Sequence, residues 1–486
     1  MKRTLFLLYA VLLAFLSSCT ACTERTPADP DDPIEVQPTD KKDTLSDAKQ
    51  NLTRSLRILE AARKFYFDGK TMYRYYNPFT GTRPSEKASV WMYTSSIEAV
   101  NAFLAGISEL KEAGDASLYD QYYGTWSGVL SELISGLDWY EGTFSLISYT
   151  GRADWSVYGV NRGTSPHTAA VDGINNVYDD QEWLVRELLH SYRITGEEKY
   201  LVKAEYLASY VIDGWDCTLK SDGTEHGGIV WGPGYFTKHS CSNGPFISPL
   251  VRLAEHYKDK DVTAVHHYIG TDKKRLVETM DKSEYYLMYA RKVYDFQKNN
   301  LYNKNKGVYY DMLGAKGDGV NYEEVDGVTY RANNEEQRAC GEFYTYNTGT
   351  MLSGAADLYR ITGEPAYLDD MTYTSSAAFR HFAVKSDGIE GCYEYPVDGF
   401  SNWFNSVLLR GWVDVSPYYS NVDLQVMSFQ HNLDYAFENN LYKGLLPPNL
   451  LCPWNTIQTY CKTEGMFEFA YAAEYAVLAH YILNKK

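Results

Sequence analysis

Apolar residues recur at helical spacing along most of the chain. From Ser46 to the C-terminus they return every three or four positions, as at Leu52, Leu56 and Leu59. This periodicity predicts twelve helices, near residues 46–67, 89–111, 117–140, 181–195, 197–213, 245–258, 280–302, 346–362, 364–384, 403–411, 421–440 and 463–484. Strand-like alternation is confined to short pieces such as residues 328–330 and 392–395. The pattern therefore predicts an all-α protein.

A short internal repeat indicates how the helices are joined. The sequence Tyr-Arg-Ile-Thr-Gly-Glu at 192–197 recurs at 359–364, and in each copy the glycine separates two helical stretches, as a helix C-cap does. Repeated helix hairpins are typical of stacked or ring-closed folds. Twelve helices arranged as six hairpins predict a closed (α/α)6 barrel. Four long segments rich in Gly, Asn and Tyr, near 141–178, 214–244, 303–345 and 385–402, are expected at one rim, where function should lie.

The N-terminal residues have the features of an export signal. Lys2 and Arg3 precede the apolar run 5–15, which is too short to span a bilayer. Leu-Ser-Ser-Cys at 16–19 resembles a bacterial lipobox, which implies cleavage before Cys19 and lipidation of its thiol. The alternative is an ordinary secretory signal. We expect residues 1–18 to be a lipoprotein signal peptide, 19–45 a lipidated cysteine with an acidic, Pro-containing linker, and 46–486 the folded domain.

Charge and composition narrow the class of partner. The net charge is −17, so we expect no nucleic-acid partner, because such a chain repels polyanions. Aromatic residues make up 15% of the chain, with 44 Tyr and 10 Trp, and their apolar faces and polar edges suit sugar rings. Most of these tyrosines should nevertheless be half-buried packing residues. The chain has eight cysteines, of which 217 with 241 and 452 with 461 are the closest pairs that export would allow to form disulfides. The spacing of cysteines, histidines and glycines matches no motif typical of a metal or cofactor site, so we expect neither. We expect the protein to be a monomer.

Two adjacent carboxyls, Asp179 and Asp180, precede the predicted helix at 181–195, with Tyr178 and Trp183 on either side. Hydrolysis of a glycosidic bond needs one carboxyl to attack or stabilise the sugar and another to move a proton. Neighbouring residues in a helix point in different directions, so we expect the pair at the helix mouth with one aspartate outside the helix. The alternative is a capping box of Asp179 with Glu182, in which Asp180 is only a first-turn acid.

Several blocks of sequence together resemble glycoside hydrolase family 76, the endo-α-1,6-mannanases. The blocks are Tyr-Asp-Asp-Gln-x-Trp at 178–183, His-Gly-Gly-Ile-Val-Trp at 226–231 with Asn243, residues 344–352, and more loosely 401–411. The resemblance implies an (α/α)6 barrel and retaining, endo-acting cleavage of α-1,6-mannosidic bonds. It implies Asp179 as the nucleophile, Asp180 as the acid/base, and Gln181 near the bound sugar.

Candidate substrate-binding residues follow from these blocks: Tyr178, Gln181, Gly228, Trp231, Asn243, Tyr346 and Asn347. Trp231 is expected to be a sugar platform, and its alternative is a plug over the barrel rim. Gly228 is expected to permit a tight turn or close backbone approach. The alternative to sugar binding by Asn243 is a side-chain hydrogen bond that shapes the loop. The alternative for Asn347 is a role as a helix N-cap.

Other functions remain open on sequence grounds. A surface glycan-binding lipoprotein would share the lipobox, the linker and the aromatic residues, but it would not need adjacent carboxyls at a helix mouth. Another (α/α)6 enzyme, such as an unsaturated glucuronyl hydrolase or a sugar epimerase, would share the fold. The leading hypothesis is a lipid-anchored hydrolase of α-mannan in the bacterial cell envelope, at the outer membrane.

Overall fold

All twelve predicted helices are present in the computed structural model, which describes residues 41–454 and 462–485. They are α2 (Lys41–Tyr66), α3 (Val90–Ala113), α4 (Ser117–Gly136), α5 (Tyr178–Thr195), α6 (Glu198–Asp213), α7 (Gly244–Tyr257), α8 (Lys282–Asn300), α9 (Thr345–Thr362), α10 (Pro365–Phe382), α11 (Ser401–Val415), α12 (Asp423–Asn439) and α13 (Gly465–Asn484). Helix α2 begins inside the predicted linker. The predicted signal peptide, Cys19, the linker up to residue 40 and Cys461 lie outside the described residues.

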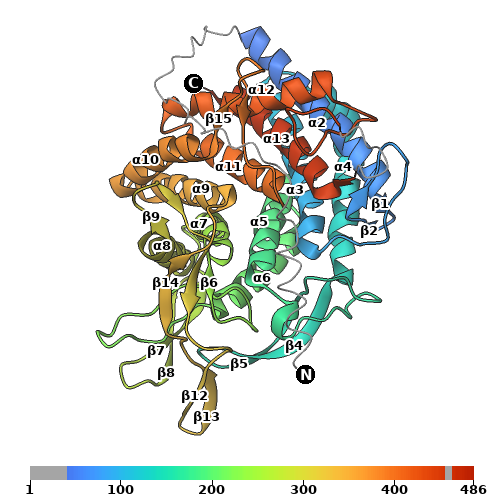
Figure 1. Ribbon diagram of the computed structural model, residues 1–486. Coiled ribbons are helices and arrows are strands. Elements are labelled where there is room, and N and C mark those ends of the chain that lie inside the picture. The colour runs from blue at the N-terminus through green and yellow to red at the C-terminus, as the bar shows by residue number, and fades with distance from the viewer. Residues whose placement is uncertain (1–40, 455–461, 486) are drawn as a thin grey trace.

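The helices form two concentric rings, as Figure 1 shows. In the inner ring, α3, α5, α7, α9, α11 and α13 each contact the next, and α13 closes the ring against α3. Helices α2, α4, α6, α8, α10 and α12 pack outside them. Inner helices such as α9 and α13 are buried around most of their circumference, because they face both the lumen and the outer ring. The fold is therefore the predicted (α/α)6 barrel.

The two copies of the internal repeat have the same local structure. Gly196 ends α5 with φ 72°, and Gly363 ends α9 with φ 70°. Each donates its backbone N–H to the tyrosine carbonyl four residues earlier, at Tyr192 and Tyr359. A glycine adopts this left-handed conformation without steric cost, so each copy ends an inner helix and turns the chain outward.

The strands are more extensive than the sequence pattern predicts. Two hairpins have strands of seven residues, β4 (Glu141–Ile147) with β5 (Arg152–Tyr158) and β7 (Thr263–Ile269) with β8 (Arg275–Asp281). The prediction that strands are confined to short pieces is wrong for both. Most residues of these strands are at least partly exposed, so neither hairpin shows the alternation of a half-buried strand.

The remaining strands are short. They are β1 (Phe67–Asp68), β2 (Thr71–Met72), β3 (Tyr75–Tyr76), β6 (Lys238–His239), β9 (Tyr302–Asn303), β10 (Val308–Tyr309), β11 (Met312–Ala315), β12 (Tyr322–Val325), β13 (Val328–Arg331), β14 (Glu336–Cys340), β15 (Val384–Lys385), β16 (Tyr393–Glu394) and β17 (Thr463–Glu464). The sheet β14–β11–β6 pairs Met312 with both His239 and Cys340. It thereby brings two of the predicted long segments, 214–244 and 303–345, together.

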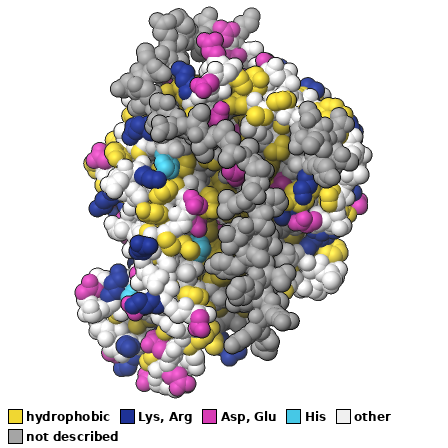
Figure 2. All heavy atoms as spheres, in the orientation of Figure 1, with side chains coloured by type: hydrophobic (Ala, Val, Ile, Leu, Met, Phe, Trp, Pro, Cys, Tyr) yellow, Lys and Arg dark blue, Asp and Glu magenta, His cyan; other side chains and the backbone are white. Residues whose placement is uncertain are grey.

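The described surface is mixed in charge. In Figure 2, acidic and basic side chains are interspersed among uncharged ones over the described part of that face. Among the helices of the described ranges, none combines the length and the apolar character that crossing a bilayer requires.

Candidate active site

A cleft of about 550 Å³ lies where the inner helices begin. It is lined by Ser89, Trp91, Val160, Asn161, Ile174, Asn175, Val177, Asp179, Asp180, Trp183, Trp231, Tyr235, His239, Cys241, Asp311, Tyr346, Phe400, Trp403 and Phe404. All four long segments that the sequence predicts at one rim contribute to this lining. The volume is that of a typical pocket for an organic ligand.

The start of α5 places the two aspartates in this cleft. Val177 is the N-cap residue, with extended backbone, and it forms no side-chain cap bond. The N–H of Tyr178 donates to the carbonyl of Trp231 at 2.8 Å, which fixes the first turn against the loop before β6. Asp179 and Asp180 both lie in that first helical turn. The capping-box reading is therefore wrong, and so is the expectation that one aspartate lies outside the helix.

Burial sets the protonation of the pair. Burial raises the pKa of Asp179 to about 6, while the Cys241 thiol, backbone N–H groups at the helix start and the Trp231 indole act in the opposite direction. Burial and the negative charge of Asp179 raise the pKa of Asp180 well above its usual range. Asp180 is 6% exposed. Near neutral pH this arrangement favours an ionised Asp179 beside a protonated Asp180, which is the division of roles that acid/base catalysis needs.

A third carboxyl, Glu182, lies on the same helix and is completely buried. Neither of its oxygens has a hydrogen-bond partner within the described residues. Burial and the charge of Asp179 raise its pKa well above the usual range. Glu182 therefore belongs to the packing behind the pair and is held in the neutral form.

Aromatic rings form the walls of the cleft. Trp231 stacks on His239 with ring centroids 4.8 Å apart, and its indole N–H is among the groups that lower the pKa of Asp179. Trp183 meets Trp403 edge to face at 4.9 Å, from α5 and α11. Apolar faces with a free polar edge are suited to sugar rings. Of the predicted binding residues, Trp231 and Tyr346 line the cleft.

Three other predicted binding residues hold the backbone around the cleft. Gln181 is fully buried, donates to the carbonyl of Tyr158 at 2.8 Å and accepts from its N–H at 3.1 Å, so it joins β5 to α5. Asn243 accepts from the N–H of Ile229 at 2.9 Å and donates to its carbonyl at 2.9 Å, the loop-forming alternative. Gly228 has φ 80°, and a Cβ there would lie 2.4 Å from the Phe296 ring.

The other two predicted residues also lie outside the lining. The Tyr178 ring is buried against the Tyr210 ring, with centroids 5.0 Å apart. Asn347 is fully buried in the first turn of α9, whose N-cap is Tyr344, so it is not the N-cap. Its side-chain N–H donates to the carbonyl of Tyr310 at 3.4 Å.

Sequence reasoning missed several lining residues, above all Asp311, His239 and Cys241. Burial and the charge of Glu342 raise the pKa of Asp311 to about 6, and burial lowers that of His239 to about 4. These residues reach the cleft through the β14–β11–β6 sheet, a long-range pairing with no local signal. Asp311 follows two tyrosines in a long loop, the same association of acid and aromatics that identified the aspartate pair.

The possible disulfide between Cys217 and Cys241 is not formed, since both are free thiols. Within residues 41–454 and 462–485, no three His, Cys, Asp or Glu side chains are grouped as metal ligands would be.

Comparison with known proteins now identifies the family. The model of glycosyl hydrolase family 76 matches residues 158–265 and 274–485, which is more than half of the chain. The protein belongs to glycosyl hydrolase family 76. It is therefore a glycoside hydrolase, and the cleft at the start of α5 is its candidate active site. No curated protein sequence matches this family 76 chain significantly.

Solved structures support the fold of this family 76 hydrolase. A family 76 mannosidase from Bacteroides thetaiotaomicron VPI-5482 is 20% identical, with a TM-score of 0.64, 88% of this chain and 98% of that chain being covered. The α-1,6-mannanase of Salegentibacter sp. HEL1_6 is 18% identical, with a TM-score of 0.57 and coverage of 89% and 99%. An inactive variant of the latter, with two consecutive aspartates replaced by asparagine, was solved with α-1,6-mannotriose. A heparin-specific unsaturated glucuronyl hydrolase shares the fold at a TM-score of 0.51 and 12% identity, with coverage of 90% and 98%.

Proposed function

We propose that this family 76 hydrolase is a retaining, endo-acting α-1,6-mannanase. The observation that carries the proposal is the consecutive pair Asp179 and Asp180 in the lining of an aromatic cleft, where burial raises both pKa values and the charge of Asp179 raises that of Asp180 further. The Salegentibacter mannanase likewise has two consecutive aspartates whose replacement gives an inactive protein that binds α-1,6-mannotriose. This parallel supports the same substrate class here.

The proposed reaction has two steps. In the first, the Asp179 carboxylate attacks the anomeric carbon, the glycosidic C–O bond breaks, and Asp180 gives its proton to the departing oxygen. In the second, Asp180 takes a proton from water as the water oxygen attacks the same carbon, and the bond to Asp179 breaks. Trp231 supplies a platform for the sugar.

The N-terminal sequence supports a proposed location. Cleavage before Cys19 and lipidation of its thiol would tether the barrel to the bacterial envelope through the acidic linker, at the outer membrane. Metabolic labelling with a palmitate analogue tests this. Labelling of the wild type and none of Cys19→Ala is the expected result, and equal labelling of both would contradict the anchor.

Hydrolysis of unbranched α-1,6-mannan by the domain from Lys41 onward tests the proposed function. Wild type should release short manno-oligosaccharides, and Asp179→Asn and Asp180→Asn should each release almost none while still binding the polymer. Glu284→Gln, on the exposed start of α8, is a matched carboxyl-to-amide control that should leave activity unchanged.

Each alternative outcome points to a different protein. Binding of α-mannan without turnover by the wild type would indicate a glycan-binding lipoprotein. Turnover of a uronic-acid-containing glycan instead of mannan would indicate another (α/α)6 activity. Full activity in both aspartate variants would overturn the assignment of this cleft.

A further inference from the structure

A second cavity, of about 290 Å³, lies between the two long hairpins. It is lined by Ser148, Thr150, Gly151, Arg152, Ala153, Trp155, Ser209, Ile212, Asp213, Trp215, Cys217, Val265, His267, Tyr285 and Tyr289. None of these residues lines the candidate active site. Its volume is at the lower end of the range for ligand pockets, about 300–1,000 Å³, so it suits a short saccharide segment.

The lining combines aromatic rings with polar groups. Tyr285 and Tyr289 present a pair of rings from α8, with centroids 5.1 Å apart. Trp155 of β5 also lines the cavity, and its indole N–H lowers the pKa of the Asp213 carboxyl. Rings beside hydrogen-bonding groups match the two-sided chemistry of a sugar.

Asp213 provides the acceptor. Its Oδ1 accepts hydrogen bonds from Ser148 Oγ at 2.7 Å and from Thr150 Oγ1 at 3.3 Å, which hold the carboxyl toward the β4–β5 turn. Burial raises its pKa, and these two hydroxyls and the Trp155 indole act in the opposite direction. Asp213 is the last residue of α6, where the helix dipole disfavours an acid. Local helix stability therefore does not explain an aspartate at this position.

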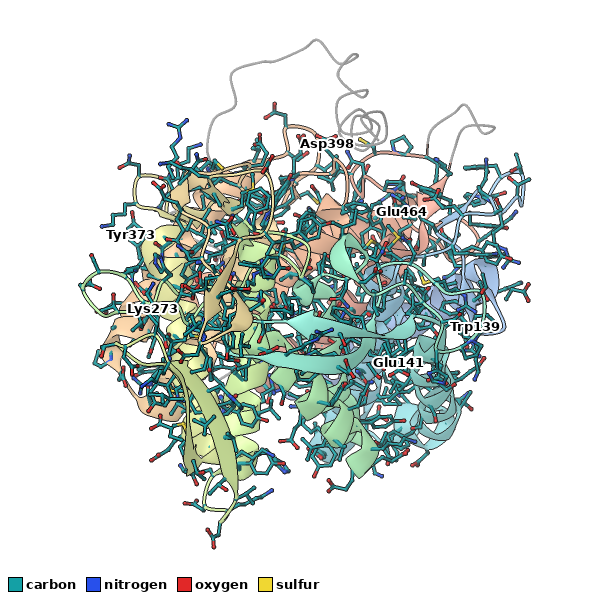
Figure 3. All side chains as sticks on the ribbon, turned by 90° about the horizontal axis from the view of Figure 1, so that it is seen from below. Trp139, Glu141, Lys273, Tyr373, Asp398 and Glu464 are labelled. Atoms are coloured by element: carbon teal, nitrogen blue, oxygen red, sulfur yellow. The ribbon has the colours of Figure 1, made fainter. Side chains whose placement is uncertain are left out.

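Parts of the two hairpins beside the cavity lie outside the family-model match. The match begins at residue 158 and omits 266–273, so it leaves out the β4–β5 turn and most of the β7–β8 turn. The two hairpins are held together by Arg275 of β8, whose Nε donates to the carbonyl of Tyr149 at 3.1 Å. Figure 1 shows the hairpins at the lower side of the barrel, and in Figure 3 the ribbons of β4 and β5 cross the middle of the view from below, with Glu141 labelled at the start of β4.

We propose that this cavity is a second binding site for a neutral saccharide, separate from the catalytic cleft. The rings of Tyr285 and Tyr289 hold the apolar face of a sugar, and Asp213 accepts from its hydroxyls. The charges of Asp213 and Arg152 balance within the lining, which therefore favours no ionic ligand, so the occupant is a segment of a neutral polysaccharide. That this polysaccharide is α-1,6-mannan rests on the proposed function. A site outside the cleft would hold a polymer chain near the enzyme without contacting the bond that is cleaved.

Affinity electrophoresis in gels containing unbranched α-1,6-mannan tests the site. All proteins carry Asp179→Asn and Asp180→Asn, so that the polymer stays intact. Adding Asp213→Asn or Tyr285→Ala should weaken retardation about two- to tenfold, the effect of losing one or two ligand contacts. Asp154→Asn is the matched control, because it removes the same charge from an exposed position on β5 outside the cavity.

Kinetics of the otherwise wild-type enzyme give a second readout. Asp213→Asn and Tyr285→Ala should raise KM for the polymer while leaving kcat/KM for α-1,6-mannotriose unchanged, because no residue lines both the cleft and this cavity. Melting temperatures check that the variants are folded.

The outcomes separate this site from the proposed function. Retardation that is undiminished in both variants, or equally diminished by Asp154→Asn, would overturn the second site alone. An equal loss on polymer and trisaccharide would show that the cavity acts only through the shape of the cleft, and would also overturn it. A parent protein that the mannan gel does not retard at all would refute mannan as the ligand of either site.

Discussion

The protonation of the aspartate pair leads to a test in which Asp180→Asn separates the two roles. Burial, and not the charge of Asp180, is the largest cause that raises the pKa of Asp179 to about 6. At pH 7 Asp179 is then roughly nine-tenths ionised. The wild-type pH profile of kcat/KM should rise through about pH 6 as Asp179 ionises, and fall at higher pH as Asp180 loses its proton.

An amide at position 180 cannot donate the proton that the departing sugar needs. For manno-oligosaccharides, kcat should fall by about 10²–10⁴-fold, the usual contribution of general acid catalysis. The residual activity should keep its acidic limb near pH 6 and lose its alkaline limb. An aryl mannoside with an acidic phenol as leaving group needs no proton, so its loss should be much smaller. Asp179→Asn removes the nucleophile and should abolish turnover of both substrates.

Initial rates on both substrates between pH 4 and 10 provide the assay. An acidic limb that moves in Asp180→Asn toward 3.8, the usual pKa of an aspartate, would show that the charge of Asp180 rather than burial sets the Asp179 pKa. An alkaline limb that persists in this variant would refute Asp180 as the acid. Greater rescue of Asp179→Asn than of Asp180→Asn by the aryl mannoside would mean that the two roles are exchanged.

Three further predictions concern the residues around the cleft. Gly228→Ala should lower the free energy of unfolding by about 2–4 kcal/mol in urea titrations, whereas Gly223→Ala should lower it by about 1 kcal/mol. Both glycines have positive φ, but only a Cβ at Gly228 would overlap an aromatic ring. Equal losses of stability in the two variants would contradict this packing argument. Gln181→Leu should cost about 1–3 kcal/mol of unfolding free energy, because it leaves buried backbone groups at the end of β5 without their partner, and an unchanged urea midpoint would contradict this role. Glu182→Gln should raise the free energy of unfolding at pH 8 and flatten its pH dependence. A carboxyl whose pKa is raised in the folded state stabilises the fold fully below its ordinary pKa of 4.5, and this stabilisation is lost as the pH rises through the folded-state pKa. Identical pH dependence in variant and wild type would contradict a buried neutral carboxyl.

The outer helices were predictable because each buries a stripe of apolar residues against a neighbour. Inner helices such as α9 kept a readable signal at their ends, where Gly196 and Gly363 repeat the same C-cap. Helix α5 begins at Tyr178 rather than at 181 because its start is fixed by a contact with the carbonyl of Trp231, which is distant in sequence. The hairpins β4–β5 and β7–β8 were missed because their strands are largely exposed on both faces, and their sequences therefore lack the alternation of apolar and polar residues that marks a half-buried strand.

The candidate site was predictable in its chemistry but not in its full membership. Asp179, Asp180 and Trp231 stand out as acids and an aromatic in a loop rich in Gly. Gln181 and Asn243 have the same polar character, yet they bond to the backbone, and only the structure separates a residue that faces ligand from one that supports the loop. Asp311 was missed because it reaches the cleft through strand pairing.

Closure of the inner ring has a consequence for how the chain folds. The first and last helices described, α2 and α13, are side by side in Figure 1, and Ser55 Oγ donates to the carbonyl of Ala472 at 2.7 Å. Arg54 likewise pairs with Asp434. Contacts between residues so far apart in sequence form slowly, because a long stretch of chain must lose conformational entropy before these contacts can contribute stabilising free energy. A nascent chain that lacks α13 has every other helix of the described residues but cannot complete the barrel, so the enzyme can acquire its native structure only after α13 has been synthesised.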